Sequence, residues 1–73
     1  MLISDWCEKH RDVVVSISNP RSKDGYRLVI TMESALSEIA IVRELSGKEP
    51  ATNDEIVNAL YEMYEELKTN RGN

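Results

Sequence analysis

Residues 12–18 read Asp-Val-Val-Val-Ser-Ile-Ser, and residues 26–32 read Tyr-Arg-Leu-Val-Ile-Thr-Met. Both runs are rich in β-branched residues and alternate between two faces, which is typical of half-buried strands. Between them, residues 19–25 read Asn-Pro-Arg-Ser-Lys-Asp-Gly, in which proline sets one turn and Asp-Gly permits positive φ. The stretch therefore predicts two antiparallel strands joined by a polar hairpin loop.

The segment that follows the hairpin is compatible with a third strand or with a helix. As a strand over 37–44 it separates isoleucines from glutamates on opposite faces. As a helix over 34–45 it leaves no continuous apolar stripe. Because Ile-Ala-Ile-Val also has high β propensity, the sequence favours the strand, and the helix stays an alternative.

The first residues have helical periodicity. Residues 3–11 place Ile3, Trp6 and Cys7 on one face of a short helix, together with His10. Ser4 is the predicted N-cap. A helix of two to three turns is unstable alone, so we expect it to dock through Trp6.

The C-terminal segment is the clearest helix. Residues 52–55, Thr-Asn-Asp-Glu, form a capping box at its start. Its apolar side chains then fall on one arc and most of its carboxylates on the opposite side. Residues 69–73 are expected to fray as a C-terminal tail.

These elements predict one small α+β domain over residues 1–73, with the order α-β-β-β-α. A three-stranded antiparallel meander packs against the amphipathic C-terminal helix, because each apolar face must be buried against another element. The predicted inward side chains are Trp6, Val13, Val15, Ile17, Leu28, Ile30, Ile39, Ile41, Ile56, Leu60, Met63 and Leu67.

This element order resembles that of the double-stranded-RNA-binding domains. That family carries a basic cluster at the start of its last helix. Here the matching position is 52–55, Thr-Asn-Asp-Glu, which is acidic. The resemblance therefore implies the topology and not the binding of RNA.

Composition narrows the class of protein. The chain has 73 residues, 41% of them hydrophobic, and a net charge of −4, which fits a globular domain rather than a disordered one. No apolar run approaches the roughly 20 residues of a membrane span. We therefore expect no association with a membrane. A single cysteine forms no intrachain disulfide, so we expect a reducing, cytoplasmic location.

The sequence gives little support for a catalytic site or a metal-binding site. Cys7 and His10 are the only thiol and the only imidazole, at i and i+3. A catalytic dyad also needs a group that orients the imidazole and an oxyanion site, and a zinc site needs three or four ligands. Phosphate-binding and metal-binding motifs are absent. We therefore expect packing roles for both residues, no cofactor, no metal and no enzyme.

The charge is unevenly distributed along the chain. Residues 33–73 carry nine carboxylates and four cations, and the C-terminal helix presents an acidic side. We expect a small non-enzymatic protein-interaction module, such as an inhibitor, an immunity protein or an anti-defence protein of a phage or other mobile element. Its partner would be a protein with a basic surface. The predicted partner-binding residues are Asn58, Tyr61, Glu62, Glu65 and Glu66.

Two alternatives remain open. The hairpin tip gathers Arg21, Lys23 and Arg27, which could contact the phosphates of a nucleic acid. The net negative charge disfavours that function. The other alternative is a structural homodimer, in which a sheet edge pairs with a second copy.

Overall fold

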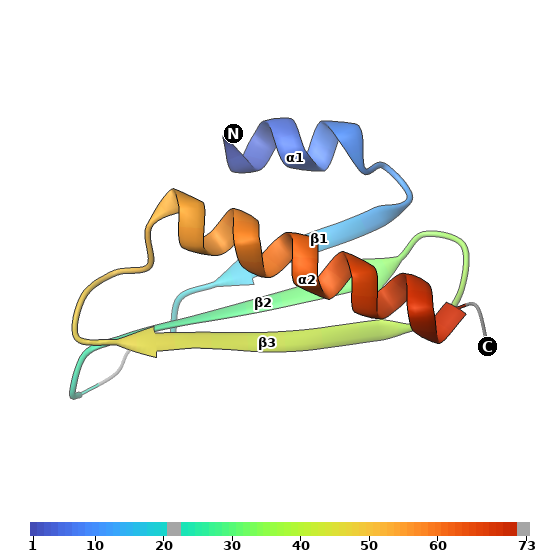
Figure 1. The fold of residues 1–73 in the computed structure, drawn as a ribbon. Coiled ribbons are helices and arrows are strands. Elements are labelled where there is room, and N and C mark those ends of the chain that lie inside the picture. Colours follow the sequence, from blue (N-terminus) through green and yellow to red (C-terminus); the bar gives the residue numbers. More distant parts are fainter. Residues whose placement is uncertain (21–22, 72–73) are drawn as a thin grey trace.

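The protein is described by a computed structural model, and the residues described are 1–20 and 23–71. The fold is the predicted α-β-β-β-α domain (Figure 1). The sheet is an antiparallel meander with the strand order β1-β2-β3, and both helices lie on one of its faces. The elements are α1 (Ile3–Lys9), β1 (Val13–Ser18), β2 (Tyr26–Ser34), β3 (Ala40–Gly47) and α2 (Asn53–Arg71).

The register separates a covered face of the sheet from an open one. Ile30 in β2 pairs with Ile17 in β1 and Arg43 in β3, and these side chains lie on the covered face. The next row along β2 belongs to the open face, where Thr31 pairs with Val42. The valine is 66% exposed, and none of the described helices and strands covers this face of the sheet.

The core lies between the covered face and α2, and Trp6 of α1 closes one side of it. The helical periodicity of α2 points one arc of apolar side chains at the sheet, as predicted. The buried hydrophobic residues are Trp6, Val13, Ile30, Met32, Val57, Ala59, Leu60, Met63 and Leu67. The predicted inward residues Val15, Leu28, Ile39, Ile41 and Ile56 are partly buried against this core.

The predicted burial of Ile17 is wrong, because its side chain is 40% exposed. It does lie on the covered face, opposite Ile30. However, the seven residues of α1 span roughly 10 Å, whereas the six residues of β1 span roughly 20 Å. The short helix cannot cover both ends of this edge strand.

The ambiguous segment is a strand, β3, and the helical alternative is excluded. It begins at Ala40, three residues later than the 37–44 range predicted. The preceding residues make the turn that reverses the chain, since the Leu36 N–H donates to Ser34 Oγ at 3.2 Å. The Ser34 N–H donates to the Ile39 carbonyl at 2.9 Å, which sets the pairing of β2 with β3.

The start of α1 differs from the prediction. Leu2, in extended conformation, precedes the first helical turn without a side-chain cap, so Ser4 is not the N-cap. The Trp6 N–H donates to the Leu2 carbonyl at 3.0 Å, which places the start of the helix before Ser4. The helix ends at Lys9, two residues earlier than the predicted end at residue 11.

The capping box of α2 is confirmed. The Glu55 N–H donates to Thr52 Oγ1 at 3.2 Å, and the Thr52 N–H donates to Glu55 Oε1 at 3.4 Å. The helix then runs to Arg71. The predicted fraying of residues 69–73 stays a prediction.

Replacing Thr52 with alanine is expected to lower the free energy of unfolding by about 1 kcal/mol, because the Glu55 N–H loses its acceptor. Urea denaturation followed by circular dichroism measures the change. Thr52→Ser, which keeps the hydroxyl, should stay close to the wild type. Equal stability of the alanine and wild-type proteins would show that the capping box adds nothing to the fold.

Candidate functional site

The outer side of α2 carries all five predicted partner-binding residues. The side chains of Leu60, Met63 and Leu67 are at most 1% exposed and fix the inner side of the helix on the core. The remaining positions of the helix are therefore held toward solvent. The predicted set is exposed at every position, namely Asn58, Tyr61, Glu62, Glu65 and Glu66.

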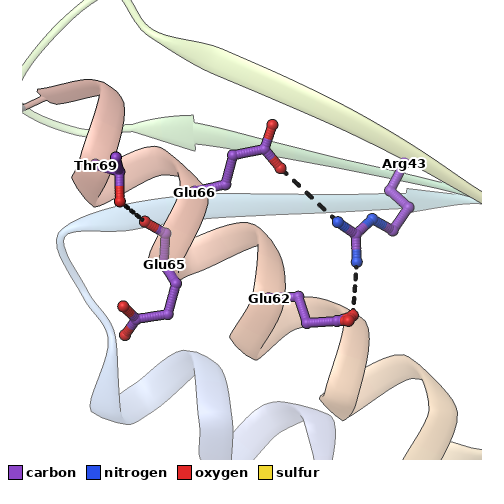
Figure 2. Close-up of polar contacts among 5 residues, drawn as sticks. All are labelled: Arg43, Glu62, Glu65, Glu66 and Thr69. Atoms are coloured by element: carbon purple, nitrogen blue, oxygen red, sulfur yellow. Dashed lines mark hydrogen bonds and ion pairs between the residues drawn. The ribbon is translucent and has the colours of Figure 1, made fainter.

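These residues do not form a single patch. Figure 2 shows Glu62 and Glu66 pointing toward Arg43 of β3, whereas the Glu65 side chain points away from it. Arg43 Nη1 lies 3.1 Å from Glu62 Oε1, and Nη2 lies 3.8 Å from Glu66 Oε2. The glutamate side chains are still 63% and 56% exposed. Their negative charge is partly offset but remains accessible.

Tyr61 of α2 faces α1. Its hydroxyl donates to the Met1 sulfur at 3.6 Å, and its ring meets that of Trp6 edge-on, with centroids 5.9 Å apart. The ring also lies 6.0 Å from that of His10. The side chain is 42% exposed, so Tyr61 offers a partly accessible aromatic surface that α1 holds in place.

Arg43 is the residue of this site that the sequence did not single out. It lies on the covered face of β3 and reaches carboxylates 19 and 23 residues away. One signal could have found it. On a strand, Arg43 shares its face with Ile41 and Leu45, and a half-buried cation on an apolar face needs an anionic partner.

Cys7 and His10 are arranged for packing. His10 Nδ1–H donates to the Trp6 carbonyl at 2.7 Å, which assigns the proton to Nδ1 because a carbonyl can only accept. The imidazole stacks on the Trp6 indole with ring centroids 4.0 Å apart. Burial raises the pKa of the Cys7 thiol, whereas a nucleophilic cysteine needs a lowered pKa.

The basic hairpin tip is only partly described, because Arg21 lies outside the described residues. Lys23 is exposed. Arg27 Nε lies 3.0 Å from Glu44 Oε1 of β3, so the charge of this guanidinium is paired within the sheet. The described part of the loop therefore offers one unpaired predicted contact, Lys23, for a nucleic acid.

A hollow of about 170 Å³ lies between the hairpin end of the sheet and the start of α2. Its walls include Tyr26, Leu45, Glu49 and Glu55. Pockets for small molecules usually measure roughly 300–1,000 Å³. This hollow is therefore sized for a side chain.

Within residues 1–20 and 23–71, no three His, Cys, Asp or Glu side chains are grouped so that they could hold a metal ion. In that part of the chain no helix has the length and apolar character needed to cross a membrane.

No protein family, curated protein or solved structure that was compared with this chain matches it.

Proposed function

We propose that this protein is a non-enzymatic interaction module that binds a basic surface of a partner protein through the carboxylates of α2. One observation carries the proposal. Glu62, Glu65 and Glu66 are exposed on a helix whose opposite side is fully packed on the sheet. The helix backbone is thus already ordered before binding, and only the glutamate side chains still have to be ordered by a partner.

The charge balance of the helix favours a cationic partner. Between Asp54 and Leu67, α2 carries five carboxylates and no cation. The single positive charge of Arg43 offsets one of these five negative charges. The next cation along the helix, Lys68, places its ammonium 5.3 Å from the centre of the Tyr64 ring. A surplus of one sign of charge on one helix speeds the encounter with an oppositely charged surface and disfavours partners of like charge.

The kind of partner suggests the class of activity. A basic protein surface is commonly one that binds nucleic acid. A small acidic domain that covers such a surface would block it. We therefore propose an inhibitor, immunity or anti-defence role, as expected for small proteins of phages and other mobile elements.

The test is affinity capture from an extract of the native host with the wild type and with Glu62→Lys/Glu65→Lys. We expect at least a tenfold loss of the captured partner for this variant, because two attractive contacts become repulsive. The matched control is Glu8→Lys/Glu38→Lys, which changes the net charge equally at exposed positions outside α2. Equal capture by the α2 variant and the control would overturn the proposal.

A further inference from the structure

We infer that the free edge of β3 is the docking site for an extended basic segment of the partner, which adds to the sheet as a fourth strand. The inference rests on the proposed function and specifies how the basic partner is held. Extended peptides bind other domains in this way, with main-chain hydrogen bonds for affinity and alternate side chains for specificity.

The outer edge of β3 presents peptide groups that point away from β2. The Ser34 N–H donates to the Ile39 carbonyl, so Ile39 and every second residue after it turn their peptide groups toward β2. The intervening residues turn theirs to the outer edge. No described segment lies beside that edge in Figure 1, where β3 is the front strand of the sheet. The residues with outward peptide groups are all exposed, namely Ala40, Val42, Glu44 and Ser46.

Carboxylates of α2 form an acidic wall beside this edge. Glu62 and Glu66 extend from α2 toward β3 (Figure 2). Glu55, seven residues before Glu62, lies on the same side of the helix. Side chains of an added strand would point alternately toward α2 and toward the open face of the sheet. Those toward α2 would meet Glu62 and Glu66, which a single guanidinium, Arg43, only partly offsets. They would also meet Glu55, whose Oε1 accepts from Thr52 but whose negative charge no cation among the described residues offsets. Arginine or lysine suits those positions.

A second copy of the chain does not suit this edge. Pairing of β3 with β3 of another copy would bring two acidic walls together. Arg43 and Glu44 also place charges in the middle of the strand, which is how natural edges resist self-association. The other sheet edge, β1 (Val13–Ser18), carries no charged side chain and so offers nothing complementary to a basic segment.

The test uses an acetylated and amidated peptide of eight residues in which arginine and threonine alternate, with binding measured by calorimetry at low salt. In the protein, Val42→Pro removes one outward N–H and obstructs the edge. Proline is tolerated there because the N–H of Val42 is not used within the sheet. We expect at least tenfold weaker binding by Val42→Pro. Val42→Thr, which keeps the N–H, should bind within about twofold of the wild type.

A second measurement leaves the protein unaltered. Two peptides with the same sequence are N-methylated at alternate amides, one in each register. Only one of them should lose affinity, because only every second amide of an added strand faces β3. On saturation with the unmodified peptide, hydrogen exchange of the Val42 and Glu44 amides should slow.

The outcomes separate this inference from the proposed function. Binding that is abolished by Glu62→Lys/Glu66→Lys but unchanged by Val42→Pro and by both methylated peptides would overturn strand addition and leave the acidic binding face standing. Absence of peptide binding would overturn strand addition alone if partner capture still depends on Glu62 and Glu65. A wild-type dimer that Val42→Pro converts to a monomer would show that the edge holds a second copy, which also overturns the inference.

Discussion

Trp6→Ala is expected to lower the free energy of unfolding by about 3–5 kcal/mol, which is a large share of the 5–15 kcal/mol typical of small domains. Trp6 is fully buried. Its indole stacks on His10 and meets Tyr64 edge-on, with ring centroids 5.8 Å apart. The side chain therefore joins α1 to α2. Without it, a helix of seven residues has too few hydrogen bonds to persist.

Urea denaturation followed by far-UV circular dichroism measures this loss, and near-UV circular dichroism reports the aromatic packing. Trp6→Phe is the matched control. Trp6 Nε1 is buried without a hydrogen-bond partner among the described residues, so phenylalanine removes an unsatisfied donor and keeps most of the apolar contact. The phenylalanine variant should lose less stability than the alanine variant. A loss below about 1 kcal/mol for Trp6→Ala would show that α1 is not part of the cooperative unit.

The sequence predicted those parts of the fold that depend on local periodicity. Alternation over residues 13–18 and 26–32 was sufficient for β1 and β2, and Thr52 with Glu55 located the start of α2. Ile17 shows the limit of such reasoning. Alternation places its side chain on the covered face, but the length and position of α1 decide whether anything covers it.

The same limit applies to the candidate site. The periodicity of α2 was sufficient to predict that Glu62, Glu65 and Glu66 are exposed. It could not predict that two of them turn toward β3, because a helical projection describes one element and not its neighbours. Arg43 was missed for this reason, and the outward peptide groups of β3 follow only from the register with β2.

Arg43 would thus compete with the cations of a partner for Glu62 and Glu66. Its guanidinium contacts both Glu62 and Glu66, two carboxylates of the acidic wall beside the free edge. Exposed ion pairs contribute about 0–1 kcal/mol to stability, and the two glutamate side chains that pair with Arg43 are 63% and 56% exposed. The pair is therefore a weak source of stability, whereas its effect on the charge of the docking surface is direct.

Arg43→Gln is consequently expected to strengthen binding of the alternating arginine–threonine peptide about tenfold at low salt, while stability falls by less than about 1 kcal/mol. Removal of the guanidinium leaves Glu62 and Glu66 free to contact the peptide, and glutamine keeps much of the aliphatic packing of the side chain. Calorimetry of binding and urea denaturation measure the two effects. The gain in affinity should shrink as salt rises from 50 to 500 mM, a range in which the screening length falls from roughly 14 to 4 Å.

Lys9→Gln provides the matched control, because it changes the net charge equally from an exposed position at the end of α1. This variant should bind the peptide as the wild type does. If Arg43→Gln weakens binding instead, the arginine acts by holding the two glutamates in a productive position, and their free charge is not what attracts the partner. If both variants strengthen binding equally, the peptide responds to net charge and not to the acidic wall beside β3.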